Sequence, residues 1–414
     1  MTRLAAAEPL VILAVAPVLL FPTPARLIIA LLLPAVWWCN RRATGHWFPP
    51  TPLNASLFLL LGMAAVSLGV TFDVPWSLPK VAGLLLGVSA FWAIARWTTS
   101  RPRLAAATAA FVLAGAVLAV LGLLGTDWLG KFPLFAPVID RLPRAIRGVP
   151  GAEEGFQPNA VAGCLVLFIP LQAALLARRD LPNAPHRGWL LGAQAALLVL
   201  TTGTLLLTQS RGAWAGLLAG FLAFLAWHSR ATRVLAAAIA AGLVLVAAQL
   251  GTQRMVDLAI SQSGPQMARN VSSRMELWSR AVDGIRDFPI TGMGMNVFRV
   301  VMPQMYPTRL STPDVDVAHA HNHLLQAALD LGIPGLVGYI GLWITVGLLL
   351  VRVYRRSAEP FARVLAGGLG AGLIAHFAFS MTDAIPLGAK VGVLFWAALG
   401  LVAALNAIYS AKPA

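Results

Sequence analysis

The sequence predicts an all-α polytopic membrane protein with about 12 transmembrane helices. Of its 414 residues, 58% are hydrophobic and only 11% are charged, whereas about 25% of the residues of a soluble domain are charged. Apolar runs recur at about the 20 residues that a helix needs to cross the hydrocarbon core of a bilayer. The arginines and lysines between these runs gather in alternate loops. These observations together place most of the chain within a membrane.

The apolar runs divide the chain into three regions. Residues 1–250 hold nine helices and an extracytoplasmic loop at 126–158, residues 251–333 form a large extracytoplasmic loop expected to bear the active site, and residues 334–414 hold three more helices. The twelve predicted spans, of which the first two are short, are 8–21, 25–39, 53–71, 78–97, 104–125, 159–177, 189–208, 212–228, 232–250, 334–353, 361–381 and 386–409.

The distribution of cations predicts the orientation. With the N-terminus inside, the short loops on one face carry 16 lysines and arginines against three acids. Short basic loops stay cytoplasmic, so we expect both termini in the cytoplasm. The formal net charge of +15 therefore reports topology. It is not evidence for a nucleic-acid partner, and no aromatic-basic motif for RNA or DNA is present.

The extracytoplasmic loop at 126–158 is basic, and two interpretations of it remain open. It is either a solvated loop at the membrane interface or a basic surface for lipid head groups or phosphates. Its cations are Lys131, Arg141, Arg144 and Arg147. At its end, Pro158 and Asn159 predict a turn into the sixth span.

Arg211 lies in the very short connection between the seventh and eighth spans. Ser210 is a helix-capping residue, which places Arg211 in the first turn of the next helix. The helix dipole opposes a cation there, so an anion bound to both Arg211 and the free backbone N–H groups explains the pattern. The alternative is an arginine that extends to the lipid head groups.

Arg274 repeats this pattern. Ser273 and Glu276 form a capping box for a helix that Pro289 ends, and they place Arg274 in its first turn. One face of this helix, at helical spacing, consists of Arg274, Trp278, Ala281 and Ile285. Because guanidinium groups bind phosphate oxygens bidentately, the two arginines predict a pyrophosphate site. A structural ion pair is the alternative for Arg274.

Three alternating histidines, His319, His321 and His323, follow in the same polar region. They have no recognised zinc spacing, so we predict no metal. The remaining interpretations are structural histidines or a general base, the role that imidazole fills best near neutral pH. A short helix is predicted over Asn322–Leu331, and the break at Gly332–Pro334 leads into the next span. This places His321 at the edge of the bundle, close to the two arginines.

These motifs resemble those of the O-antigen ligases (WaaL-type). The sequence His321-Asn322, followed by nine residues and Gly332-Ile333-Pro334-Gly335, is similar to the histidine signature of that family. Three further motifs resemble the broader family of O-antigen ligases and polymerases. They are Ser210-Arg211-Gly212, Arg274 with Trp278 ahead of Pro289-x-x-Gly292-x-Gly294, and Pro158-Asn159. One departure is Ala215, where the family often has leucine four residues after the helix-start arginine.

The resemblance implies a GT-C-like glycosyltransferase in the inner membrane of a Gram-negative bacterium. Its donor would be O-antigen on undecaprenyl pyrophosphate and its acceptor the lipid A–core oligosaccharide, both at the periplasmic face among the membrane lipids. Transfer would be inverting and would need no metal or cofactor. His321 would be the general base and Arg211 and Arg274 the pyrophosphate ligands. The supporting residues would be Asn322, Asp383 and Arg147.

Other functions also fit this resemblance and this composition. An O-antigen polymerase or a protein O-oligosaccharyltransferase would use the same donor with a different acceptor. A flippase or transporter of lipid-linked glycans would also have about 12 spans, but its polar residues would follow a path through the bundle. Here they concentrate at one face, which favours an enzyme.

Overall fold

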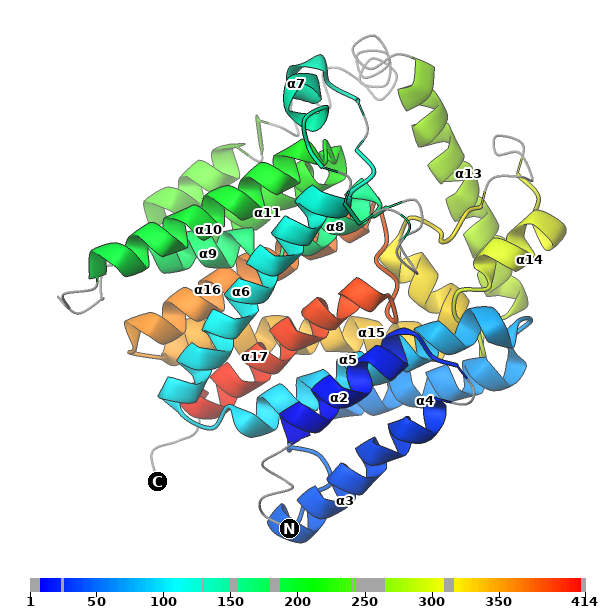
Figure 1. Ribbon diagram of the computed structural model, residues 1–414, viewed down its shortest axis with the longest axis horizontal. Coiled ribbons are helices and arrows are strands. Elements are labelled where there is room, and N and C mark those ends of the chain that lie inside the picture. The colour runs from blue at the N-terminus through cyan, green and yellow to red at the C-terminus, as the bar shows by residue number, and fades with distance from the viewer. Residues whose placement is uncertain are drawn as a thin grey trace.

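The computed structural model describes residues 8–410 except 24–25, 129, 144, 147, 149–154, 179–186, 229, 240, 243–264 and 309–315. Within these residues the chain is a bundle of helices (Figure 1), and the one β-type pairing is an isolated bridge between Thr126 and Phe156. The elements are α2 (Glu8–Leu20), η1 (Leu27–Leu31), α3 (Leu32–Thr44), α4 (Asn54–Val70), α5 (Val74–Trp97), α6 (Arg101–Gly125), η2 (Pro133–Phe135), α7 (Ala136–Ile139), α8 (Pro158–Leu165), α9 (Ile169–Leu176), α10 (Arg187–Leu207), α11 (Arg211–His228), α13 (Pro265–Asp287), α14 (Phe298–Met305), α15 (His323–Arg356), α16 (Pro360–Ser380), η3 (Lys390–Gly392) and α17 (Val393–Ser410).

The lengths and hydropathy of these helices identify a polytopic α-helical membrane protein. Among the described residues, 7 helices are long and apolar enough to span a bilayer, and three shorter apolar helices accompany them. Two of the 12 predicted spans have no matching apolar helix among the described residues. The run 25–39 forms the short 3₁₀ helix η1 and then α3, and residues 240 and 243–250 of the run 232–250 lie outside the described residues.

The loops predicted to be cytoplasmic gather at one end of the bundle, which we call the arginine end. Arg101 pairs with Glu359 at 2.6 Å, and Arg96 pairs with Glu8 at 2.9 Å. The guanidinium of Arg101 also lies 5.9 Å from the ring centre of Tyr409. The starts of α2, α6 and α16 and the end of α17 therefore lie together, while α13 and α14 lie beside the start of α15 (Figure 1).

Glycines allow α11 to approach α16 at backbone distance. A Cβ atom on Gly216 would lie 2.5 Å from the carbonyl oxygen of Ala375, and one on Gly220 would lie 2.4 Å from that of Ala371. Larger residues at these positions would push the helices apart. The close packing places the first residue of α11 against the loop that follows α16.

The predicted short helix and break in front of the tenth span are confirmed. Within α15, Gly332 has φ 68° and ψ −179°, a conformation essentially confined to glycine. The N–H of Ile333 donates to the carbonyl of Pro289 at 2.7 Å, and the N–H of Met293 donates to that of Leu329 at 2.8 Å. The glycine-rich turn after α13 therefore packs into the break of α15.

Candidate active site

Asp383 lies at the centre of the candidate site, in the loop that follows α16, and its side chain is only 9% exposed. Nδ1 of His321 lies 3.0 Å from its Oδ1 atom. The side-chain amide of Asn159, in the first turn of α8, donates to its Oδ2 atom at 2.6 Å. Nη2 of Arg274 lies 3.9 Å from the same Oδ2 atom. Three segments that are distant in sequence thus meet at one carboxylate.

The contact with Asp383 determines which nitrogen of His321 is free. An ionised carboxylate can only accept hydrogen bonds, so Nδ1 of His321 carries the proton and donates it. In the neutral ring, Nε2 then has an unshared electron pair. This is the tautomer that a general base requires, held as in a catalytic triad by a buried carboxylate.

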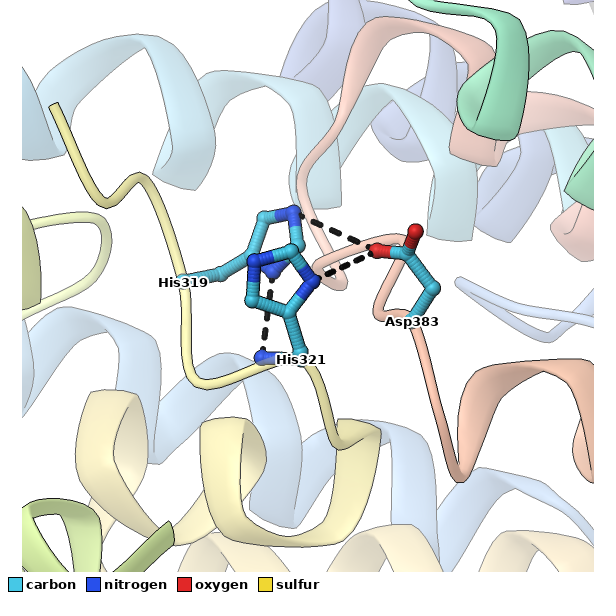
Figure 2. A group of neighbouring side chains, drawn as sticks. All are labelled: His319, His321 and Asp383. Carbon is cyan, nitrogen blue, oxygen red and sulfur yellow. Dashed lines mark hydrogen bonds and ion pairs between the residues drawn. The ribbon is translucent and has the colours of Figure 1, made fainter. Parts of the chain in front are cut away.

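His319 lies beside His321, and both rings face the same oxygen of Asp383 (Figure 2). The backbone N–H of His321 donates to Nδ1 of His319 at 3.2 Å, and Nε2 of His319 lies 3.8 Å from Oδ1 of Asp383. Since Nδ1 of His319 accepts a hydrogen bond, its neutral ring carries the proton on Nε2, directed toward Asp383. His321 itself has φ 51°, a left-handed conformation that is uncommon for residues other than glycine.

Electrostatics keeps Asp383 charged and His319 neutral. Burial disfavours the charged carboxylate, but the hydrogen bond and charge of His321, with the charges of His319 and Arg274, outweigh this effect and lower the pKa of Asp383. Burial and the charge of His321 lower the pKa of His319 to about 4, although Asp383 opposes the shift. Near neutral pH the pair of side chains therefore carries one negative charge, on Asp383.

Asn322 caps α15 and joins it to the Asp383 loop. Its Oδ1 atom accepts the N–H groups of Leu324 and Leu325 at 3.0 and 3.1 Å, and its Nδ2 atom donates to the carbonyl of Met381 at 3.3 Å. Satisfying the free N–H groups at a helix start stabilises that start. Asn322 therefore holds the residue before it, His321, in position.

His323 is separate from this group. Its ring is buried, and its Nδ1 atom lies 2.8 Å from the hydroxyl of Tyr339 within α15. Of the three alternating histidines, His319 and His321 contact Asp383, while His323 packs among aromatic side chains such as Phe377, with ring centres 4.7 Å apart.

The structure corrects the predicted helix start near Arg274. Helix α13 begins at Pro265, so Ser273 and Glu276 lie inside it, and Arg274 is not in the first turn. The free N–H groups and the dipole at the start of α13 therefore do not act at Arg274. The inward face contains Ala281 as predicted, but Leu277 takes the buried place assigned to Trp278.

Arg211 is the first residue of α11, as predicted, with Ser210 in the capping position before it. A Cβ atom on Gly212 would lie 2.8 Å from the hydroxyl oxygen of Thr382. The start of α11 therefore packs against the residue that precedes Asp383. This brings Arg211, Arg274 and His321 to one end of the bundle.

Lys131 joins these groups, although the sequence indicated it only as one cation of a basic loop. The N–H of Phe132 donates to Oε1 of Gln209 at 2.6 Å, and the ring of Phe132 stacks on Trp214 with centres 5.6 Å apart. Partial burial and the charge of Arg211 lower the pKa of Lys131; Asp383 opposes the shift and the charge of Arg274 adds to it. The loop thus carries a third cation to the two arginines.

Arg147, predicted as a supporting residue, lies outside the described residues. The prediction also missed the contacts of Asn159 and His319. Asn159 was signalled only by the Pro158-Asn159 motif and His319 only by its place in the histidine segment. Neither motif indicates a partner more than 60 residues away.

The same side chains also offer atoms that could bind a metal. Ligand atoms of His319, His321 and Asp383 all lie within 4.8 Å of one another. Imidazole nitrogen and carboxylate oxygen suit zinc and related ions. Arg274 and Lys131 act on the same carboxylate, and their positive charges disfavour a further cation there.

Comparison with known proteins finds a family match over the central part of the chain. Residues 196–340 match the family model described as O-antigen ligase. This segment contains Arg211, Arg274, His321 and the break at Gly332, whereas Asp383 lies beyond it. No curated protein matches the chain in sequence. The central segment of the chain, residues 196–340, is therefore similar to the O-antigen ligase family.

Proposed function

We propose that the protein transfers O-antigen from undecaprenyl pyrophosphate to a sugar hydroxyl of the lipid A–core oligosaccharide. The observation that carries the proposal is the shared carboxylate. Asp383 orients His321 as a base through one oxygen, at 3.0 Å, while Arg274 lies 3.9 Å from the other. A proton acceptor and a phosphate-binding cation thus lie side by side, as a displacement of a phosphorylated leaving group requires.

The reaction is a single inverting displacement. Nε2 of His321 accepts the proton of the acceptor hydroxyl as that oxygen forms a bond to the anomeric carbon of the donor sugar. The bond between this carbon and the phosphate oxygen breaks, and undecaprenyl pyrophosphate leaves with the electron pair. The imidazolium that forms is stabilised by the charge of Asp383.

Arg211, Arg274 and Lys131 bind the pyrophosphate and stabilise the negative charge that develops on it. Cations placed where charge develops in the transition state stabilise that state directly. The residues thus perform the task that a divalent metal performs in many phosphate-dependent enzymes. Asn322 and Asn159 hold His321 and Asp383, and Arg147 is proposed as a further cation of the same loop as Lys131.

We also propose that the site faces the periplasm of a Gram-negative inner membrane, with 12 spans and the arginine end in the cytoplasm. The support is the basic composition of the loops at that end. Single cysteines replacing exposed Arg101 and Met275, in a chain without Cys39 and Cys164, should be labelled from the cytoplasm and the periplasm respectively. Cytoplasmic labelling at Met275 would overturn the site assignment.

A reconstituted reaction tests the proposal. Purified protein is mixed with undecaprenyl-pyrophosphate glycan and lipid A–core, without nucleotide and with EDTA. Formation of core-linked glycan by the wild type, and its loss in His321→Asn, is the expected result. Longer undecaprenyl-linked glycan would indicate a polymerase instead. Movement of the donor across vesicles without any new bond would indicate a transporter, and inhibition by EDTA would indicate a metal at the histidines.

A further inference from the structure

A second group of cationic and aromatic side chains borders the site on the side of His319. The guanidinium of Arg299, on α14, lies 4.3 Å from the ring centre of Trp76, on α5. Nε of Arg299 donates to Oδ1 of Asp316 at 2.9 Å, and its Nη2 also contacts this carboxylate. Asp316 lies three residues before His319, so this ion pair connects the histidine segment to α14.

Backbone contacts hold this group against α5. The side-chain amide of Asn296 donates to the carbonyl of Trp76 at 3.1 Å, and the hydroxyl of Ser77 donates to the carbonyl of Met295 at 2.9 Å. Trp76 and Lys80 therefore lie on α5 and Arg299 on α14, which these contacts hold together. The side chains are preorganised, so ordering them on ligand binding would cost little free energy.

The charge of this group is positive where it meets His319. Lys80 and Arg299 both contribute to lowering the pKa of His319, after burial and His321. The carboxylates nearby are Asp316, which is 62% exposed, and Asp330, which lies within electrostatic range of Lys80. Lys390 is close enough to act on Lys80 as well. Besides Asp383, which is already paired with His321 and Arg274, three cations thus face two carboxylates.

Trp76 makes the group suited to a sugar rather than to a bare anion. Its side chain is 43% exposed although Arg299 covers part of the ring. An exposed indole offers a large, rigid apolar face with a polar edge, which suits the apolar face of a pyranose ring. The guanidinium beside it suits a phosphate or carboxylate on the same sugar.

We propose that Trp76 and Arg299, with Lys80, form a subsite for an anionic sugar of the acceptor glycan. The inference rests on the proposed function, which assigns the side of Arg211, Arg274 and Lys131 to the donor pyrophosphate. The acceptor hydroxyl must reach Nε2 of His321 while the rest of the acceptor extends away from the donor. The side of Asp383 and His321 on which His319 lies provides that direction and carries a sugar-binding surface.

The test measures KM for acceptor and donor separately in Trp76→Ala and Arg299→Gln. Both variants should raise the acceptor KM about tenfold, equivalent to ~1.4 kcal/mol of binding, while the donor KM stays near that of the wild type. Trp189→Ala and Arg286→Gln, exposed residues outside this group, are the matched controls. Trp76→Ala keeps the test valid if Arg299→Gln disturbs the Asp316 loop.

Treated acceptors identify the anionic group. Phosphatase removes phosphate groups from the acceptor, and chemical reduction removes its carboxylates. One of these two treatments should abolish the difference in acceptor KM between Arg299→Gln and the wild type. An unchanged acceptor KM in both variants would overturn the subsite. So would an Arg299→Gln effect that vanishes in vesicles lacking anionic phospholipid, since this indicates a lipid head group. A wild type that transfers no glycan at all would instead overturn the proposed function.

Discussion

The side-chain amide of Asn159 donates a 2.6 Å hydrogen bond to Oδ2 of Asp383, a residue 224 positions further along the chain. Because this bond uses Oδ2, the other carboxylate oxygen, Oδ1, can accept a hydrogen bond from Nδ1 of His321 at 3.0 Å. The two oxygens of Asp383 therefore have separate partners. The orientation of the proposed base thus depends on α8 as well as on the loop after α16.

Replacing Asp383 by asparagine should impair the chemical step more than donor binding. The amide oxygen can accept the hydrogen bond from Nδ1 of His321, but it supplies no charge to stabilise the imidazolium. We expect the rate of a single turnover to fall by about 10²-fold or more, within the range of general base catalysis. Asp140→Asn, an exposed change in another loop, should have the wild-type rate. Unchanged single-turnover kinetics in Asp383→Asn would show that the carboxylate does not act on the base.

Replacing Arg211 or Arg274 should lower the rate of glycan transfer, and lysine should be a better replacement than alanine. Arg274→Ala and Arg211→Ala should each lower transfer by about 10²–10³-fold, the loss typical of removing one charge-stabilising group. Lysine at either position should restore part of this activity, since it lacks the bidentate fork of arginine. Initial rates of glycan transfer measure this, with Arg286→Ala as the control. Normal transfer in both alanine variants would contradict the pyrophosphate site.

His319 should make the stability of the fold depend on pH. In the folded state its pKa is about 4, against an ordinary value of 6.5. Between these values the unfolded chain binds a proton at this residue and the folded chain does not, so the free energy of unfolding falls as the pH falls. Burial is the main cause of this shift, and the charged or titratable neighbours of His319 are His321, Asp383, Lys80 and Arg299.

Thermal unfolding between pH 7 and pH 4 measures this effect. His319→Asn keeps an acceptor for the N–H of His321 but removes the titrating group, so its melting temperature should fall less over this range than that of the wild type. His46→Asn, an exposed change at the arginine end, should follow the wild type. Identical pH profiles for His319→Asn and the wild type would show that His319 does not titrate in this way.

Packing of α11 against α16 should be sensitive to a single methyl group. In Gly216→Ala the new Cβ atom would lie 2.5 Å from a backbone oxygen that cannot move alone. Overpacking of this kind costs about 1–3 kcal/mol, so both the melting temperature and the transfer rate should fall. Gly203→Ala is the matched control, because its Cβ atom would meet no atom within 4 Å. Equal stability of the two variants would mean that the helices separate without cost.

Local patterns predicted those features of the site that depend on neighbouring residues. The break at Gly332 followed from the glycine and proline of one short segment, and the start of α11 followed from Ser210. The start of α13 was wrong because the spacing of Ser273 and Glu276 fits a helix interior as well as a capping box. The mixed polar and apolar residues 265–272 that precede Ser273 were not interpreted as a helix.

Contacts between distant segments could not be predicted in the same way. The partners of Asp383 come from α8, α13 and the histidine segment, and the folded bundle alone brings them together. Lys131 reaches the arginines because Phe132 is held by Gln209, a contact that no spacing indicates. Asp383 was the exception, since it was already predicted as a residue that supports His321.

The single-turnover rate of His321→Asn tests the central claim most directly. Asparagine tolerates the left-handed backbone of this position but cannot accept the proton of a hydroxyl as imidazole does. With donor and acceptor bound at saturation, the rate of glycan transfer should fall by about 10²–10⁴-fold. Affinity for the undecaprenyl-pyrophosphate donor should stay close to that of the wild type, because the arginines bind it. Transfer at the wild-type rate by a folded His321→Asn protein would contradict the assignment of His321 as the base.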